Sequence, residues 1–218
     1  MRIVAIQKNQ SITRSVGAVL GYSGAVTSAT AYTWYAIYLM QGEADTNVIT
    51  WTLWALESVL SFFIYRRQTG NDFASYLEEA VASLGCISIT LLMTFRAIWF
   101  DADIFGPLEW IDGISAVLFL WVLKVYRRTE RTGDVWPATL WFQVLLVVSS
   151  LPLVRSTWEN PHGEPLWPWV IWSTGFALQL TCAYLRREGK SFRTLLTPFN
   201  YFFWHAAVGV IVMTSGAA

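Results

Sequence analysis

Seven apolar segments, each long enough to cross a lipid bilayer as a helix, follow one another along this chain of 218 residues. A transmembrane helix needs about 17 to 25 mostly apolar residues. Because lipid offers no hydrogen-bond partners to the backbone, such segments are expected to be helical. Only 14% of the residues are charged, whereas about a quarter are charged in a soluble domain. We therefore predict an all-α integral membrane protein, a single membrane domain over residues 1–218, with seven transmembrane helices near residues 16–40, 48–65, 76–98, 108–126, 135–154, 166–185 and 195–215.

The basic residues alternate between the two sides that these seven spans define. Lys and Arg gather on the cytoplasmic side of short loops, and 13 of the 15 basic residues fall on the side of the N-terminus. Only Arg96 and Arg155 fall on the other side. We expect a cytoplasmic N-terminus and an outer C-terminus, in a prokaryotic inner membrane. The basic residues of the inner side are Arg2, Lys8, Arg14, Arg66, Arg67, Lys124, Arg127, Arg128, Arg131, Arg186, Arg187, Lys190 and Arg193, and the outer acidic residues are Glu43, Asp45, Asp101, Asp103, Glu109, Glu159 and Glu164.

The sequence also contains an internal repeat at an offset of 118 to 120 positions. The segment NVITWTLWALESVLSFFIYRRQTGNDF aligns with PLWPWVIWSTGFALQLTCAYLRREGKSF, so that Trp51 and Trp54 match Trp169 and Trp172. A dibasic pair, a Gly and a Phe follow in both halves. The repeat predicts two three-helix units, at 16–98 and 135–215, joined by a linker helix at 108–126. An even number of spans separates the units, which makes them parallel, and solutes bind between such repeats near the membrane midplane.

This 3+1+3 plan resembles the PQ-loop superfamily, which includes the SWEET sugar transporters and, more distantly, the PnuC vitamin transporters. The segment SSLPLVRSTWENPHGEPLWPWVIW is similar to the Leu-Pro-Gln segment of that family, with Leu153 at the position of the signature Gln. Pro152 would be its gating hinge, but Trp34 stands opposite Pro152 in the first half. The resemblance implies a transporter or facilitator for a small polar or aromatic solute, such as a sugar, nucleoside or vitamin, that works by alternating access.

The matched Trp pairs are the first candidates for binding such a solute. Trp51 and Trp54 are three residues apart, as are Trp169 and Trp172, so each pair shares one face of its helix. Facing indoles could hold a sugar or heterocycle in a pocket with few polar groups. In the resembling families, Trp residues of these helices line the substrate. The alternative is an interfacial belt, because both pairs are within about a turn of the outer interface, where Trp residues gather in any case.

Glu57 is the one acidic residue expected near the middle of a span. A charge at that depth is costly, about 2.5 to 3.5 kcal/mol on insertion scales, and so it should face the bundle interior or a wet cavity. Glu57 could take part in proton coupling or hydrogen-bond the solute. A structural hydrogen bond to a Ser or Trp of a neighbouring helix is the alternative. Glu78 and Glu79 are instead expected in the first turn of their helix, where negative charge is favourable.

Asn200 and His205, both in the last span, complete the predicted substrate-binding set of Trp51, Trp54, Glu57, Trp169, Trp172, Asn200 and His205. The resemblance implies an Asn at the position of Asn200. His205 could titrate with Glu57, or it could stabilise the bundle by a hydrogen bond. Gln143 and Gln179 have the same two interpretations. Asp112, near the outer end of the fourth span, is assigned a topological or gating role in contact with solvent.

Other classes of function receive little support from the sequence. The formal net charge of zero provides no basic field for nucleic acid. Two His residues and the absence of nucleophile, zinc or phosphate-loop motifs predict no enzyme, metal or cofactor. The expected partners are the lipid bilayer and a small-molecule solute. Further copies of the chain in a homo-oligomer, or the subunits of a larger membrane complex, are the other candidate partners. The alternative function is a non-transporting subunit or scaffold that packs against a larger membrane complex.

Overall fold

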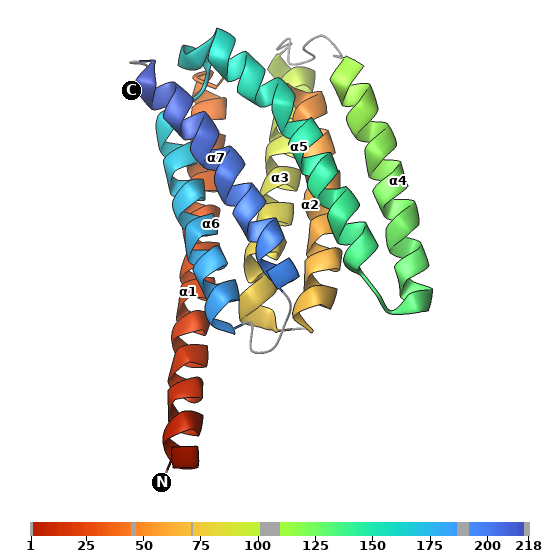
Figure 1. The fold of residues 1–218 in the computed structure, drawn as a ribbon. Helices are drawn as coiled ribbons and strands as arrows, with labels where there is room; N and C mark the ends of the chain where they lie inside the picture. Colours follow the sequence, from red (N-terminus) through yellow and green to blue (C-terminus); the bar gives the residue numbers. More distant parts are fainter. Residues whose placement is uncertain (1, 45–46, 71, 101–109, 187–191, 216–218) are drawn as a thin grey trace.

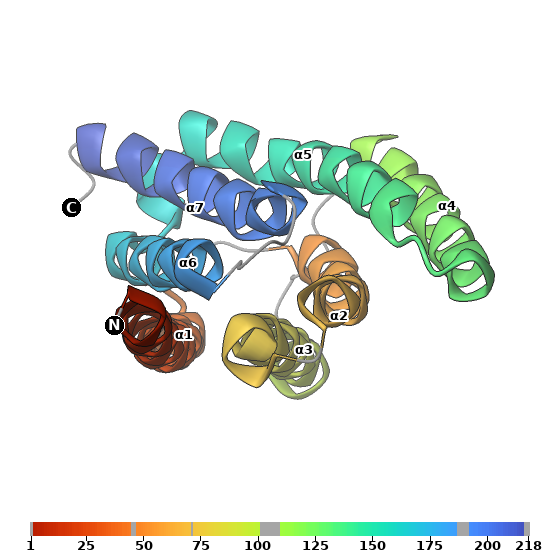
Figure 2. The same cartoon turned by 60° about the horizontal axis from the view of Figure 1, so that its bottom comes forward.

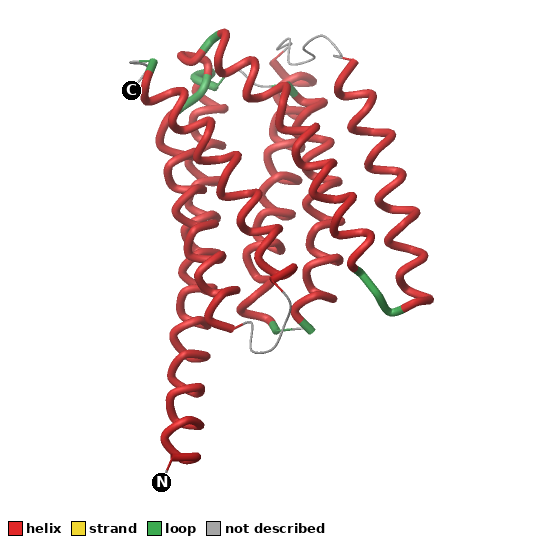
Figure 3. The backbone as a smooth tube through the Cα atoms, in the orientation of Figure 1, coloured by secondary structure: helices red, strands yellow, loops and turns green. Residues whose placement is uncertain are grey.

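The computed structural model describes residues 2–44, 47–70, 72–100, 110–186 and 192–215, and these residues form helices without any strand (Figures 1 and 3). The predicted all-α fold is confirmed. The helices agree with the predicted segments to within a few residues, except that the first begins well before residue 16. Their bounds are α1 Arg2–Gln41, α2 Val48–Thr69, α3 Phe73–Phe100, α4 Trp110–Thr132, α5 Trp136–Glu159, α6 Leu166–Arg186 and α7 Leu196–Thr214, with short 3₁₀ helices at Pro161–Gly163 (η1) and Phe192–Leu195 (η2).

Four helices of the described residues are long and apolar enough to cross a membrane: Val48–Thr69, Phe73–Trp99, Trp136–Glu159 and Phe192–Thr214. They correspond to α2, α3, α5 and α7. The remaining three, α1, α4 and α6, have 40, 23 and 21 residues, so that they fall short in apolar character and not in length. The chain is therefore helical and membrane-protein-like.

Local sequence signals define the ends of α2. At its start, the side chain of Asn47 accepts a hydrogen bond of 2.8 Å from the backbone N–H of Ile49, as an N-cap residue does. At its end, Gly70 has a left-handed backbone with φ of 65°, and its N–H donates to the carbonyls of Arg66 and Arg67. The two Arg side chains occupy the last turn, where positive charge suits the helix dipole.

Six helices form a closed ring, and α4 lies outside it (Figure 2). Around the ring, α1 packs on α3, α3 on α2, α2 on α5, α5 on α7, α7 on α6, and α6 on α1. The contact between α1 and α6 is the most extensive in the molecule, whereas that between α2 and α5 is among the sparsest of the ring. The outer helix α4 packs on α5 and, less closely, on α2.

Glycines allow α1 and α6 to approach each other closely. A Cβ atom built on Gly24 would lie 2.9 Å from the carbonyl oxygen of Gly175, and one built on Gly175 would lie 3.1 Å from the carbonyl oxygen of Gly24. The Cβ atom on Gly175 would also collide with the hydroxyl of Ser28. Small residues bring membrane helices into backbone contact in this way. Hydrogen is therefore the only side chain that fits at this crossing.

The last turns of α2, α4 and α6 lie at the end of the bundle where α1 begins, and the last turn of α7 lies at the opposite end (Figure 1). Arg66, Arg67 and Arg131 are in the last turns of α2 and α4, at the same end as the start of α1. Several charges used to predict the orientation lie outside the described residues: Asp45, Asp101, Asp103, Glu109, Arg187 and Lys190.

Candidate functional site

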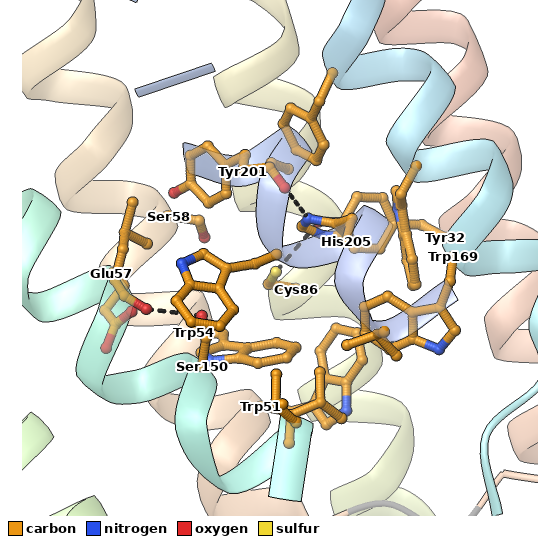
Figure 4. A pocket seen from close by; sticks show the side chains of 18 residues that line it. Tyr32, Trp51, Trp54, Glu57, Ser58, Cys86, Ser150, Trp169, Tyr201 and His205 are labelled. Atoms are coloured by element: carbon orange, nitrogen blue, oxygen red, sulfur yellow. Dashed lines mark hydrogen bonds between the residues drawn. The ribbon is translucent and has the colours of Figure 1, made fainter. Parts of the chain in front are cut away.

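A small cavity lies at the centre of the six-helix ring (Figure 4). Its volume of about 50 Å³ is space for a few water molecules, at about 10 to 15 Å³ each. Every ring helix contributes to its wall and α4 does not. The lining residues are Tyr32 of α1; Trp51, Trp54, Glu57 and Ser58 of α2; Ala82 and Cys86 of α3; Leu146, Ser150, Leu153 and Val154 of α5; Trp169, Trp172 and Phe176 of α6; and Tyr201, Trp204, His205 and Val208 of α7.

The two Trp pairs of the sequence repeat meet at this cavity. Trp51, Trp169 and Trp172 are only 3%, 2% and 0% exposed, and Trp54 is half-buried. Ring centroids lie 5.4 Å apart within the first pair, 5.0 Å within the second and 6.3 Å between Trp51 and Trp172. The tilted and edge-to-face geometry is the one that aromatic pairs prefer. An interfacial belt is therefore the wrong interpretation for these four residues, which face the bundle interior.

Other Trp residues occupy the bundle surface near the end that carries the C-terminus. Trp99 ends α3, Trp110 begins α4, Trp158 ends α5 and Trp167 begins α6, and all four are exposed. Indoles on the outside of a helix end are typical of a membrane interface. Sequence position alone did not separate these residues from the buried pairs, because both groups lie close to the same helix ends.

One residue of α5, Ser149, holds both Trp54 and Glu57 of α2. The Ser149 hydroxyl donates to the Oε2 atom of Glu57 at 2.7 Å, and the indole N–H of Trp54 donates to the Ser149 carbonyl at 3.3 Å. The other carboxylate oxygen of Glu57, Oε1, is buried without a partner. Glu57 thus lies at the cavity, as predicted, and forms the structural hydrogen bond that was its alternative interpretation.

Pro152 lies inside α5, one turn beyond Ser149, and is buried. Proline lacks the N–H that would bond the carbonyl four residues earlier, and its ring crowds that carbonyl. The α5 backbone is therefore interrupted next to the residue that bonds α2. Leu153, the next residue, lines the cavity with an apolar side chain.

His205 faces the cavity among aromatic rings. Its ring centroid lies 5.5 Å from Trp169 and 4.8 Å from Phe176. Its Nδ1 atom is 2.7 Å from the carbonyl oxygen of Tyr201. Because a carbonyl only accepts, Nδ1 carries the proton, and Nε2 of a neutral imidazole is then an acceptor. His205 and Glu57 line the same cavity (Figure 4), but among the described residues no hydrogen bond joins them.

Asn200 is the predicted binding residue that does not line the cavity. Its amide Nδ2 donates to Oε1 of Gln143 at 2.9 Å, and Gln143 Nε2 donates to the hydroxyl of Thr197 at 3.2 Å. These bonds join α7 to α5. Asp112, in the first turn of α4, is 4% exposed, so the expectation that solvent reaches it is wrong.

Three buried acidic residues, Glu164, Glu78 and Glu79, lie in other places than the sequence predicted. Glu164, expected among the outer charges, is buried and accepts hydrogen bonds from Trp169 Nε1 at 3.0 Å and from the Tyr35 hydroxyl at 3.3 Å. Glu78 and Glu79 are not in a first turn, since α3 begins at Phe73, and both are 0% exposed. Glu57 is therefore not alone among acidic residues in the interior. The hydroxyls of Ser28 and Ser61, which donate to Glu78 and Glu79, could not be identified as their partners from the sequence.

Comparisons with protein-family models, curated proteins and solved structures found no match to this chain. The chemistry must therefore be inferred from the cavity itself. Its wall contains five Trp, two Tyr and one Phe residue, together with the carboxylate of Glu57 and the imidazole of His205. Such a wall can stack against the flat face of a ring and offer it one hydrogen-bonding acid and one acceptor.

Proposed function

We propose that the protein is a membrane transporter or facilitator for a small polar or aromatic solute, which it binds in the central cavity. The observation that carries this proposal is the wall of that cavity, to which all six ring helices contribute and which brings together Trp51, Trp54, Glu57, Trp169, Trp172 and His205. A site at the meeting point of two repeats is typical of transporters built from such units.

The packing of the helices supports two parallel repeats around this cavity. In the first unit α3 lies between α1 and α2, and in the second α7 lies between α5 and α6. The contacts between the units have the same symmetry, because α1 packs on α6 and α2 on α5. The linker helix α4 is outside the ring. This arrangement supports the two three-helix units and linker helix that the repeat predicts.

The small cavity represents a closed state of this transporter. Small-molecule pockets usually have about 300 to 1,000 Å³, so the two units must separate before a sugar-sized solute fits. Polar contacts between the units close both ends. Arg186 of α6 forms an ion pair of 2.6 Å with Asp72, which lies just before α3. Tyr35 of α1 donates a hydrogen bond to Glu164, which lies just before α6. Opening one contact while the other holds would give alternating access.

The charges support an orientation with the N-terminus in the cytoplasm, and we propose a prokaryotic inner membrane as its location. The last turns of α2, α4 and α6, at the end of the bundle where α1 begins, carry Arg66, Arg67, Arg131 and Arg186. Exposed indoles mark the opposite end. Cytoplasmic loops carry the excess of positive charge in membrane proteins.

Uptake into proteoliposomes, screened over sugars, nucleosides, vitamins and amino acids, tests the proposal. Wild-type protein should take up at least one class, and Glu57→Gln or Trp172→Ala should lower that uptake at least tenfold. Glu159→Gln is the matched control, since Glu159 is exposed and bound to Arg155 of its own helix. Asn200→Ala should leave the affinity unchanged, because Asn200 does not reach the cavity. Equal uptake by all four variants would contradict the assignment of the site.

A non-transporting subunit of a larger membrane complex is the second candidate function. It is favoured by one observation: Asn200 and Glu57 already bond neighbouring side chains, and the central cavity is small. In this case no solute class would be taken up, and a stable complex with larger membrane proteins would copurify from native membranes. That pair of results would overturn the transporter proposal.

A further inference from the structure

Glu78 and Glu79, adjacent residues of α3, are fully buried outside the central cavity. Adjacent residues of a helix point about 100° apart, because a turn has 3.6 residues. The two carboxylates accordingly reach different neighbours. Glu78 accepts a hydrogen bond from the hydroxyl of Ser28 of α1, and Glu79 accepts one of 2.9 Å from the hydroxyl of Ser61 of α2.

One oxygen of each carboxylate has no partner. Oε2 of Glu78 and Oε1 of Glu79 are buried without a hydrogen bond. Among the described residues the ion pairs are Arg155–Glu159 and Arg186–Asp72, and neither involves these two residues. A buried carboxylate with a single hydroxyl donor and no countercharge is strongly unfavourable when ionised. The same carboxylate is neutral, and becomes a hydrogen-bond donor, once it carries a proton.

Gln179 of α6 brings an acceptor to the same region. It is fully buried, and its Nε2 donates to the carbonyl of Ser75, one turn before Glu78 on α3, while its Oε1 has no partner. A Cβ atom on Gly24 of α1 would lie 3.5 Å from Oε2 of Glu78 and 3.4 Å from the backbone N of Gln179. Oε2 of Glu78 therefore lies at a junction of α1, α3 and α6 to which the buried Gln179 also belongs. A proton there would provide the missing donor.

The surroundings favour a proton over a metal cation. A hard cation needs about six or more converging oxygen ligands, whereas the two carboxylates diverge, and the described residues hold no cluster of three metal-binding side chains. The other titratable groups facing the pair do not neutralise it, since the Tyr and Cys side chains are uncharged near neutral pH and the ion pair has no net charge. Tyr32 of α1 interacts with Glu78, and Tyr65 of α2 and Tyr201 of α7 interact with Glu79. Cys182 of α6 contacts the Ala74 carbonyl, one turn before Glu78, and the Asp72–Arg186 ion pair lies at the start of α3.

We propose that Glu78 and Glu79 form a proton-binding site that couples solute movement to the transmembrane proton gradient; this inference rests on the proposed transport function. A proton from water forms an O–H bond on each carboxylate and allows it to stay buried when the units close. Loss of the proton to water leaves an unpaired charge that favours opening of the junction. The Asp72–Arg186 ion pair lies beside this junction at the end of α6, and it is the contact that must open for cytoplasmic water to enter.

Infrared difference spectroscopy of the protein in phosphatidylcholine and phosphatidylglycerol vesicles tests the site without any solute. A pH jump should remove protonated-carboxyl C=O bands, and Glu78→Gln and Glu79→Gln should each delete one of them. Glu159→Gln, at an exposed carboxylate, should change no such band. Size-exclusion profiles and thermal melts establish that each variant is folded. Carboxylates that are ionised across the whole pH range, or bands that shift on addition of Na⁺ at constant pH, would overturn the proton site.

Transport measurements test the coupling. An imposed proton gradient should accelerate uptake of the solute found in the screen, and Glu78→Gln, at the junction of α1, α3 and α6, should lose that acceleration but retain solute exchange without a gradient. Uptake that is indifferent to the gradient in every variant would overturn the coupling and leave the transporter proposal intact. Failure to find any solute, together with intact carboxyl bands, would instead overturn the transporter proposal and support the proton site alone.

Discussion

The α1–α6 and α2–α5 interfaces occupy equivalent places in the ring but are built in different ways. At α1–α6, Gly24 and Gly175 bring the backbones together over the most extensive contact in the molecule. At α2–α5 the contact is sparse and depends on hydrogen bonds to Ser149, next to the proline of α5. Close backbone packing resists separation, whereas a few polar bonds break readily. We infer that the Gly24–Gly175 crossing is the pivot of the proposed transporter and that α2–α5 separates most. The contacts at the two ends of α6, Arg186–Asp72 and Tyr35–Glu164, release in turn around this pivot.

Cross-linking α2 to α5 is the strongest test of this comparison. Gln68 of α2 hydrogen-bonds Thr139 of α5, so Gln68→Cys and Thr139→Cys, bridged by a short thiol-cleavable reagent, should abolish solute uptake until the bridge is reduced. The native cysteines, Cys86 and Cys182, are free and buried and would first be replaced by Ala.

The control for this experiment is a bridge within one unit. Gln143 of α5 and Asn200 of α7 are also hydrogen-bonded, but both belong to the second triplet. A bridge between Gln143→Cys and Asn200→Cys should leave most of the uptake intact. Full uptake with α2 and α5 bridged would show that the opening lies elsewhere.

A methyl group in the α1–α6 interface should destabilise the fold. The Cβ of Gly175→Ala would collide with Ser28 and approach the Gly24 carbonyl, and overpacking of this kind costs about 1 to 3 kcal/mol. Gly113→Ala in α4 is the matched control, because nothing lies within 4 Å of its Cβ position; it should stabilise by up to about 1 kcal/mol. Thermal melts in detergent would measure both, and equal melting temperatures would contradict the tight interface.

Removal of the hydroxyl at the α2–α5 interface should have the smallest effect. Ser149→Ala deletes the hydrogen bond to Glu57, and such bonds between membrane helices contribute about 0.6 kcal/mol on average and about 1.7 at most. The melting temperature should therefore fall slightly, whereas the rate of opening, measured by thiol labelling of a Cys placed at Ser150, should rise. A large loss of stability without faster labelling would mean that Ser149 supports the fold instead of the gate.

The helices could be predicted from the sequence far better than the contacts of their side chains. Apolar length and turn residues are local, so the bounds of α2 and α6 differ little from the predicted segments. The repeat likewise matched Trp51 and Trp54 to Trp169 and Trp172 before any contact was known. These signals depend on positions along the chain and not on how the helices are rotated.

The errors concern which way a side chain faces. An interfacial belt stayed open as the alternative for the Trp pairs, because depth in the membrane can be estimated from sequence, whereas the buried face of a helix depends on its partners. Glu79 looked like a helix-start residue because the predicted segment began three residues late, near 76 instead of Phe73. Asn200 was placed at the cavity by family resemblance, but its amide instead bonds Gln143. Only the packed ring of helices decides such cases.

The two bonds that Ser149 makes to α2 have a consequence for the kinetics of the protein. Trp54 and Glu57 are both held by this one residue, through its carbonyl and its hydroxyl. Because the carbonyl and the hydroxyl of Ser149 move together with α5, a displacement that breaks the bond to Trp54 also breaks the bond to Glu57. The two contacts are therefore lost cooperatively. Partial openings are then sparsely populated. For the proposed transporter we expect single-molecule recordings to show abrupt, all-or-none openings, and the rate of uptake to follow the frequency of these openings and not their width.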